Sequence, residues 1–402
     1  MGMKLSDQKG SKAAILQVLR IYGSISRIAL TQTTGLSRAT VSISISELID
    51  AGLVREIPNR EFTVGRPATS LELVSHTRAI LGADLHRNAW TLGAFDLTGN
   101  TLKTANIPVS ESSPEAAAKQ LAREFPDFVN RLDVDPLPFL GLGTPGLVDS
   151  ERGTILSASD LGWNNVDIGS IMSGEIGWPT VVLNRHRARG LSECRYGMKG
   201  NYQNMVYIGI GTGIAAGVFM NGQLFSGSVG GAGEVGHMTM EPDGLPCPCG
   251  NTGCLQLYSA EPAIEQEARR LIRMGNTDSI FSDPGFDIQL LKAPDICKAA
   301  EEGDAIAASA IRKAATYLGI GMANIVNLYN PDAIILGGAV PSSSRLFVET
   351  AARVMQQRAI RPLSNKTEVH ASSYNERGGA LGAANFALDK LISYSLFTVS
   401  KP

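Results

Sequence analysis

The sequence predicts a small N-terminal α+β module, residues 1–78, followed by a two-lobed α/β module, residues 79–402. Two observations predict this division. Apolar residues at helical spacing dominate the first fifty positions and give way to two short strand patterns. After about residue 78, buried strand patterns alternate with helical ones, and several strands end in glycine-rich turns. The chain has 402 residues, of which 44% are hydrophobic, enough for two or three domains.

Three helices and two strands are expected in the N-terminal module. The predicted helices are 11–22, 26–33 and 38–50, and the predicted strands are 53–57 and 70–74. Ser37 is a good N-cap for the third helix, after a tight turn that contains Gly35. Helix, helix, glycine turn, helix and two-stranded wing is the pattern of a winged helix-turn-helix, which places its third helix in the major groove of DNA.

The third helix offers short polar donors and one arginine, which suit phosphates and base edges. The predicted DNA-contacting residues are Ser37, Arg38, Thr40, Ser42 and, in the wing, Arg66, which we expect to enter a narrow minor groove. Ile43 is unusual in such a helix and either packs or touches a thymine methyl group. Residues 1–75 carry about three excess positive charges, which favours double-stranded DNA over the alternative, a module that binds protein. This charge is modest, so we expect a homodimer or homotetramer on a two-fold operator.

In the larger module, strands and helices alternate. Strands are predicted at 79–84, 91–96, 101–108, 139–142, 181–183, 206–210, 215–220 and 333–336, and helices at 115–132 and 305–328. Pro126 is expected to break or kink the first of these helices. The longest apolar stretch, 205–220, contains glycines and is too short to span a membrane. With no visible signal peptide, the sequence predicts a cytoplasmic protein without a membrane partner.

One short segment contains a histidine and three cysteines: His237, Cys247, Cys249 and Cys254. One imidazole and three thiols form the ligand set of a closed tetrahedral zinc site, and the intervening glycines and prolines favour turns that bring the thiols together. The alternative is three packed core thiols with a separate surface histidine. The density of ligand types in so short a loop favours a structural Zn²⁺ ion.

Several motifs carry a resemblance to a known family. They are the segment 211–254, GTPGLVD at 143–149, GWNNVDI at 162–168, ILGGAV at 335–340 and VGRP at 64–67. With these motifs the chain resembles the ROK family (repressors, open reading frames and sugar kinases), in the subgroup with an N-terminal winged helix-turn-helix. The resemblance implies an actin-like ATPase (ribonuclease H-like) fold, zinc on the four ligands and a sugar pocket between the lobes. Lobe one is then expected at about 79–184 plus a C-terminal helix at about 376–395, and lobe two at about 185–375.

Three departures from the family pattern fall on the phosphoryl-transfer chemistry. ROK kinases have an Asp-Gly-Gly-Thr turn after the first strand, whereas here Asp84 is followed by Leu-His-Arg-Asn. The family's catalytic aspartate follows an asparagine, but here Asn184 is followed by Arg185, and arginine cannot act as a general base. Gln256 stands where kinases have glutamate. The sequence therefore predicts no kinase activity and no catalytic residues.

The ligand pocket is less well defined by the sequence. The resemblance implies that Asn184, Glu234 and His237 contact sugar hydroxyls, and that Arg185 and Gln256 alter the pocket. Arg185 either pairs with Glu234 or receives an anionic ligand such as a sugar phosphate. A neutral or modified sugar, an anionic sugar and no ligand at all stay open as alternatives.

These observations together predict a sugar-responsive DNA-binding transcriptional regulator, a repressor of carbohydrate genes with a degenerate kinase site. Two alternatives are kept. One is an ATP-dependent sugar kinase with a DNA-binding head, and the other is a regulator controlled by a protein partner instead of a sugar.

Overall fold

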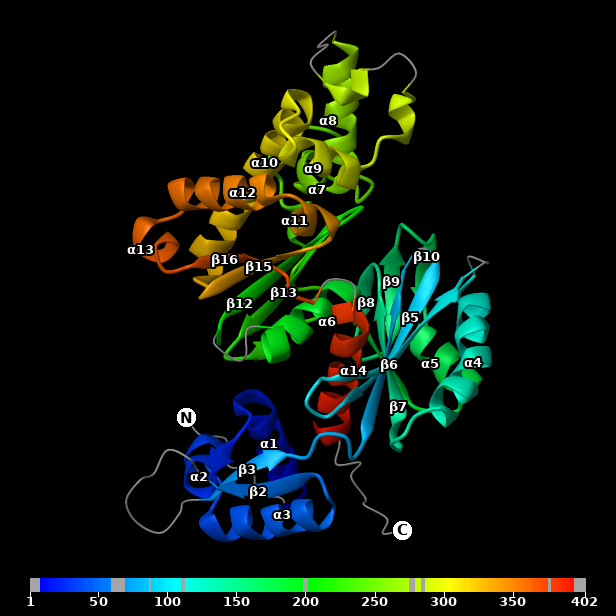
Figure 1. Cartoon of the computed structure of the whole chain (residues 1–402), viewed down its shortest axis with the longest axis vertical. Coiled ribbons are helices and arrows are strands. Elements are labelled where there is room, and N and C mark those ends of the chain that lie inside the picture. The colour runs from blue at the N-terminus through cyan, green and yellow to red at the C-terminus, as the bar shows by residue number, and fades with distance from the viewer. Residues whose placement is uncertain are drawn as a thin grey trace. The chain divides into compact units, whose positions relative to one another are not determined.

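The computed structural model describes residues 8–58, 69–86, 88–109, 113–197, 202–274, 279–282, 286–374 and 377–393. The chain forms two compact units (Figure 1). Unit 1 comprises Met1–Ala188 with Gly379–Pro402, and unit 2 comprises Arg189–Gly378; each is described by itself. Among the helices in the described ranges, none has the length and apolar character to cross a membrane.

The N-terminal part of unit 1 has three helices and a three-stranded sheet in the order β1-β3-β2. The elements are α1 (Gln8–Tyr22), β1 (Ile25–Ser26), α2 (Arg27–Thr34), α3 (Arg38–Asp50), β2 (Val54–Pro58) and β3 (Thr69–Leu73). The Ser37 hydroxyl accepts a hydrogen bond from the backbone N–H of Thr40, so the predicted N-cap of α3 is confirmed. The sequence predicted two strands and missed β1, which is two residues long and pairs with β3 through Ile25 and Leu71.

Helix α3 buries one stripe of side chains, Val41, Ser44, Ile45 and Leu48, in this N-terminal part. The Ser44 hydroxyl lies 2.7 Å from that of Ser11 on α1, and Lys12 on α1 forms an ion pair with Glu47. The opposite stripe of α3 is exposed. The apolar spacing read from the sequence therefore identified which face of the helix packs inward.

Helix α1 also contacts the C-terminal helix of the same unit, α14 (Arg377–Ser393). The Arg20 side chain, 3% exposed, donates to the carboxylate of Asp389 at 2.5 Å and to the amide oxygen of Asn385. Asn385 is itself fully buried. A buried guanidinium with two acceptors therefore joins the first helix of the chain to the last.

The main sheet of unit 1 has the order β11-β7-β4-β5-β6, in which β4, β5 and β6 are antiparallel and β4, β7 and β11 are parallel. The strands are β4 (Ala79–Leu85), β5 (Ala89–Asp96), β6 (Thr101–Pro108), β7 (Pro136–Thr144) and β11 (Thr180–Asn184). A smaller antiparallel sheet contains β8 (Leu147–Asp149), β9 (Thr154–Ala158) and β10 (Trp163–Val166). Helices α4 (Pro114–Asn130) and α5 (Ile168–Ile176) pack on one face of the main sheet.

The sheet of unit 2 repeats this order as β14-β13-β12-β15-β16, again with three antiparallel strands followed by parallel neighbours. The strands are β12 (Met205–Ile210), β13 (Ile214–Met220), β14 (Gln223–Leu224), β15 (Ala333–Gly337) and β16 (Glu368–Ala371). Side chains of β12, β13 and β15 share one core with α8 (Glu261–Arg273), α9 (Ala293–Glu301), α10 (Ala305–Tyr329) and α12 (Arg345–Arg358).

The helices that follow the unit 1 sheet complete the two units. They are α6 (Arg185–Ser192), η1 (Glu193–Gly197), η2 (Val235–His237), α7 (Gln256–Ser259), α8 (Glu261–Arg273), η3 (Ile280–Ser282), η4 (Ile288–Leu290), α9 (Ala293–Glu301), α10 (Ala305–Tyr329), α11 (Ala339–Ser343), α12 (Arg345–Arg358) and α13 (Arg361–Ser364). Helix α10 matches the long helix read from the sequence, and Gly338 is the N-cap residue of α11.

The expected effect of Pro126 is partly wrong. Helix α4 runs without a break from Pro114 to Asn130, with Pro126 inside it. Phe125 and Phe128 are buried on either side of the proline, whereas Pro126 itself is exposed. Burial of the two aromatic side chains stabilises the helix enough to offset the hydrogen bond that proline cannot donate.

Helix α14 covers the other face of the unit 1 sheet at unusually close range (Figure 1). A Cβ atom on Gly82 of β4 would lie 2.0 Å from the carbonyl oxygen of Ala380, and one on Gly141 of β7 would lie 1.9 Å from that of Ala383. A Cβ on Gly382 of the helix would lie 1.7 Å from the Ala188 carbonyl oxygen. Glycine is required at these positions because backbone meets backbone directly.

Replacement of Gly141 by alanine tests this contact. The added methyl group meets backbone that cannot rotate away, so we expect the variant to lose about 1–3 kcal/mol of stability, measured as a lower midpoint of urea unfolding. Gly174→Ala in α5 is the matched control, because its Cβ would meet no atom within 4 Å; a gain of about 0.4–1 kcal/mol is expected. Equal midpoints for the two variants would contradict the packing described.

Candidate metal centre and ligand site

A brief 3-10 helix and a folded loop bring the four predicted metal ligands together in unit 2. Gly233 and Gly236 let the segment that carries His237 lie against the backbone of β13, since a Cβ on either would lie 2.1 Å from a β13 carbonyl oxygen. In the loop that follows, the backbone N–H of Cys247 donates to the Asn251 carbonyl at 2.8 Å. The intervening Gly250 and Gly253 adopt positive φ values of 94° and 69°, as expected of the glycines that form the turns.

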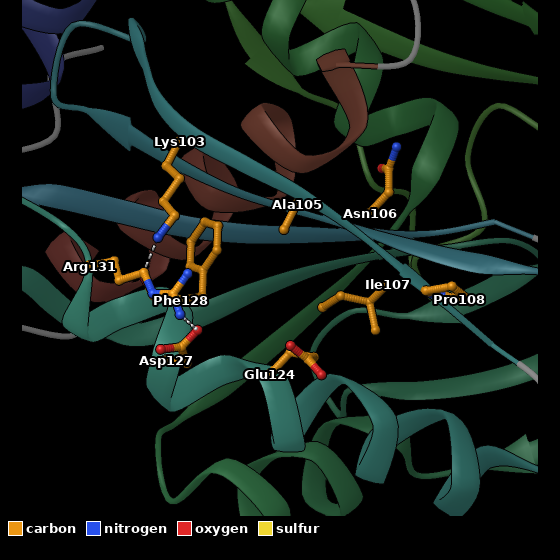
Figure 2. Close-up of a pocket in the computed structure, with 9 residues that line it drawn as sticks. All are labelled: Lys103, Ala105, Asn106, Ile107, Pro108, Glu124, Asp127, Phe128 and Arg131. Atoms are coloured by element: carbon orange, nitrogen blue, oxygen red, sulfur yellow. Dashed lines mark hydrogen bonds and ion pairs between the residues drawn. The ribbon is translucent and has the colours of Figure 1, made fainter.

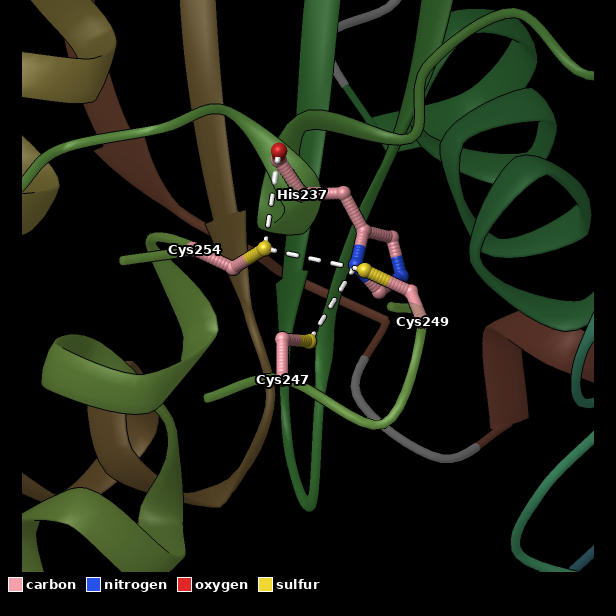
Figure 3. Close-up of side chains that lie close together, drawn as sticks. All are labelled: His237, Cys247, Cys249 and Cys254. Carbon is pink, nitrogen blue, oxygen red and sulfur yellow. Dashed lines mark hydrogen bonds between the residues drawn. The ribbon is translucent and has the colours of Figure 1, made fainter. Parts of the chain in front are cut away.

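The ligand atoms of His237, Cys247, Cys249 and Cys254 all lie within 4.8 Å of one another (Figure 3). The Sγ atoms of Cys249 and Cys254 are 3.7 Å apart, and Cys247 Sγ is 3.7 Å from His237 Nδ1. Cys247 and Cys254 are buried, whereas Cys249 is exposed. The alternative of separately packed core thiols is therefore excluded, and the cluster can hold a metal ion.

The Cys249 and Cys254 thiols differ in pKa because their surroundings differ. Burial raises the pKa of the Cys254 thiol to about 12. A hydrogen bond from the Asn251 backbone lowers the pKa of the Cys249 thiol. The Cys249 thiol therefore loses its proton more readily than the Cys254 thiol, and thiolate is the form that binds metal.

The sequence did not identify the side chains that brace this loop. The Tyr258 and Tyr317 rings stack with centroids 4.6 Å apart. The Tyr258 hydroxyl accepts from the Leu245 N–H at 3.0 Å, and the Tyr317 hydroxyl donates to Glu241 at 3.0 Å. The N-terminal part of the loop is thus held against α7 and α10. The only signal in the sequence was the position of Tyr317 within the long predicted helix.

Gln256, predicted to line a ligand pocket, contacts the cysteine cluster. Its side-chain amide lies 3.5 Å from Cys247 Sγ, and Asn251 similarly reaches Cys254 Sγ at 3.5 Å. Hydrogen bonds to ligating sulfur orient the ligands and disperse thiolate charge. Glu234 immediately precedes the 3-10 helix of His237, and its carbonyl accepts the His237 N–H at 3.1 Å.

In unit 1, Asn184 ends β11 and caps α6. Its side-chain oxygen accepts from the backbone N–H groups of His186 at 2.9 Å and Arg187 at 3.3 Å. Its amide nitrogen donates to the Gly146 carbonyl at 2.8 Å, and the residue is 4% exposed. The asparagine therefore organises the loops at this strand end, which the sequence had not indicated.

Arg185, which the sequence offered either as a partner of Glu234 or as the receiver of an anionic ligand, contacts side chains near the end of β4 in unit 1. The Arg185 guanidinium lies 2.8 Å from His86 Nδ1 and 3.7 Å from a carboxylate oxygen of Asp84. Asp84 is fully buried, and His86 Nε2 lies 3.4 Å from it. A carboxylate without solvent needs a nearby cation, and Arg185 supplies one from a position 101 residues later in the chain.

The N-terminal residues predicted to contact DNA gather at the start of α3. Ser37, Arg38 and Ser42 are exposed, and Thr40 is half-buried. The hydroxyls of Ser37 and Thr40 lie 2.9 Å apart, so both take part in the helix cap. Arg66 lies outside the described residues.

A cavity of about 370 Å³ lies elsewhere in unit 1, between β6 and α4 (Figure 2). Lys103, Asp127, Phe128 and Arg131 contribute to its walls. Asp127 forms an ion pair with Arg131 at 2.8 Å, and the Lys103 ammonium lies 4.9 Å from the Phe128 ring centroid. None of the predicted ligand-binding residues lines this cavity.

Comparisons with known proteins identify the family. The profile of the ROK family matches residues 80–390. The xylose repressor of Caldicellulosiruptor bescii is 29% identical over 388 residues, which cover 96% of each chain. The crystal structure of a ROK family transcriptional regulator, a homologue of the E. coli MLC protein, aligns with a TM-score of 0.83 and 27% identity over 97% of this chain and 98% of its own.

A kinase of the same family aligns over a smaller part of the chain. The ROK family glucokinase from Streptomyces griseus, solved with glucose and AMPPNP, has a TM-score of 0.69 and 26% identity; the alignment covers 77% of this chain and 98% of the glucokinase. These matches account for the two sheets of like strand order, which are those of the actin-like ATPase fold. The predicted resemblance is confirmed: this chain belongs to the ROK family.

Proposed function

We propose that this protein is a sugar-responsive, DNA-binding transcriptional regulator that represses carbohydrate genes. One observation carries the proposal. The regulator relatives match the chain over 96–97% of its length, whereas the glucokinase matches 77% of it while using 98% of its own chain. The family profile begins at residue 80. The part that distinguishes this chain from a kinase is therefore its N-terminal module.

We assign residues 1–78 to a winged helix-turn-helix domain and residues 79–402 to a sugar-sensing domain of two lobes. Three short helices, a small sheet and the exposed polar start of α3 support the first assignment. Ser37, Arg38, Thr40, Ser42 and Arg66 are the proposed DNA contacts. Two copies of the chain, at least, would present two heads to a palindromic operator.

Loss of kinase chemistry accords with the surroundings of Arg185. A general base must accept a proton from the sugar hydroxyl, but here a guanidinium occupies the end of β11 and contacts Asp84 and His86. Arginine stays protonated at any physiological pH. The proposed role of the sugar-sensing domain is to bind a sugar and change shape. The proposed ligand contacts are Asn184, Arg185, Glu234, His237 and Gln256.

Structural zinc is the ion that best fits the cysteine cluster. Four ligands around zinc at about 2.3 Å for sulfur and about 2.0 Å for nitrogen form a tetrahedron, whose sulfur–sulfur edge is about 3.8 Å. The observed separation of Cys249 and Cys254 sulfurs is 3.7 Å. A zinc ion on His237, Cys247, Cys249 and Cys254 would fix the loop next to Glu234.

The proposed function is tested by thermal melting against a panel of neutral sugars and sugar phosphates. A true effector raises the unfolding midpoint by mass action and lowers operator affinity by about 5- to 150-fold, the range of a coupling energy of about 1–3 kcal/mol. Incubation with ATP and each stabilising sugar should give no phosphorylated product. Turnover of ATP into a sugar phosphate would support the kinase alternative instead.

Arg38→Ala should weaken operator binding. If Arg38 reads a base, the loss is about 1–3 kcal/mol; if it contacts a phosphate, the slope of log affinity against log salt falls by about one. Fluorescence anisotropy at several salt concentrations distinguishes the two. Arg152→Ala removes another exposed arginine, outside the N-terminal module and on the proposed sugar-sensing domain, and should change neither quantity. Unaltered binding by the Arg38 variant would argue against α3 as the recognition helix.

Cys249→Ser should remove the metal and the effector response together. Cys249 is exposed, so the substitution leaves the core intact while taking away one of four ligands. Native mass spectrometry should find one zinc ion per wild-type chain and none in the variant. Cys194→Ser, a cysteine outside the cluster, is the control and should retain zinc. Full metal content in the Cys249 variant would mean that the ligand set is wrong.

A further inference from the structure

The exposed face of α3 has an unusual composition for a helix in water. Its outward stripe consists of Ala39, Ser42, Ile43 and Ser46, spaced i, i+3, i+4 and i+7, and all four are exposed. Ile43 is 50% exposed. None of the four side chains can ionise, although solvated helix faces are normally rich in charged residues. The stripe lies opposite the buried one formed by Val41, Ser44, Ile45 and Leu48.

Charged residues occur only at the ends of this stripe. Arg38 stands at the first position of the helix, whereas Glu47 and Asp50 stand in its last turn. Glu47 is already paired with Lys12. DNA phosphates are therefore attracted to the start of α3 and repelled from its end. This polarity orients the first two turns of the helix, which include Ala39 and Ile43, toward a duplex.

We propose that Ala39 and Ile43 form a ridge that reads thymine C5-methyl groups in the major groove. The inference rests on the proposed DNA-binding function and names the base feature that α3 recognises. The C5-methyl of thymine is the apolar group that distinguishes base edges in the major groove, and apolar side chains are its partners. The two residues are four positions apart, a rise of about 6 Å along the helix, which matches about two base-pair steps of about 3.4 Å each.

The neighbouring hydroxyls fit the same partner. Ser42 and Ser46 accompany the ridge on the same stripe, and serine donates to or accepts from either type of base pair. The stripe is too small for the other occupant of an exposed apolar face, a protein. A stable protein–protein interface takes roughly 800 Å² from each partner, more than three small side chains and one isoleucine provide.

The test uses the full-length protein and an operator selected from random-sequence duplexes. Each thymine of a half-site is replaced in turn by deoxyuridine, which removes only the methyl group. We expect a loss of about fourfold in affinity at one or two thymines, corresponding to about 0.8 kcal/mol for one buried methyl-sized group. In Ile43→Ala, the difference between thymine and uracil should disappear at one of these positions.

Ile28→Ala is the matched control, because Ile28 is a 65% exposed isoleucine on α2 of the same module. It should keep the wild-type discrimination between thymine and uracil. If uracil costs nothing anywhere while Arg38→Ala still weakens binding, the methyl ridge is wrong and the proposed function stands. If no duplex is selected at all, the DNA-binding function itself fails. If Ile43→Ala changes the mass of the assembly but not the thymine preference, the stripe is a protein contact and the inference is overturned.

Discussion

The close approach of α14 to the main sheet is the contact on which the packing of unit 1 depends. Gly82 and Gly141 bring β4 and β7 within reach of the helix backbone, with no side chain between. The 190 residues Arg189–Gly378 form unit 2, and the chain then comes back to unit 1 with α14. Closely packed backbone cannot move aside as a side chain can. The contact therefore fixes the place where the chain leaves unit 1, after Ala188, relative to the place where it returns, at Gly379.

The close packing of α14 on the sheet also explains why the carboxylate of Asp84, at the end of β4, is buried. A Cβ on Gly379, at the start of α14, would lie 2.1 Å from the carboxylate of Asp84, so the helix excludes water from that group. An isolated carboxylate in such a place is costly, and a cation nearby offsets the cost. Arg185 supplies positive charge there, and His86, which lies between the guanidinium and Asp84, adds hydrogen-bonding capacity. Arg185, proposed above to stand where the kinases have their general base, therefore has a structural task in this chain.

Local features of the sequence predicted the elements and the metal cluster well. Helix α3 was predicted with its observed bounds because Ser37 and the apolar spacing act within a few residues. The cysteine cluster was predictable because its four members lie within 18 positions. Strand β1 was missed because two residues carry no periodicity, and their pairing with Leu71 depends on the fold. Likewise, contacts such as Arg185 with Asp84, or Gln256 with Cys247, join positions that no spacing rule links.

The buried guanidinium of Arg20 has a consequence for how such proteins are built from parts. The Arg20 side chain joins the first helix to the last through Asn385 and Asp389. The N-terminal module is therefore attached to α14 by specific side-chain contacts. A chimera that exchanges the first 78 residues for those of a relative would leave two acceptors on α14 facing whatever replaces the arginine. Interchangeability of heads among these regulators therefore depends on a matched donor at that one place as well as on the sequence each head recognises.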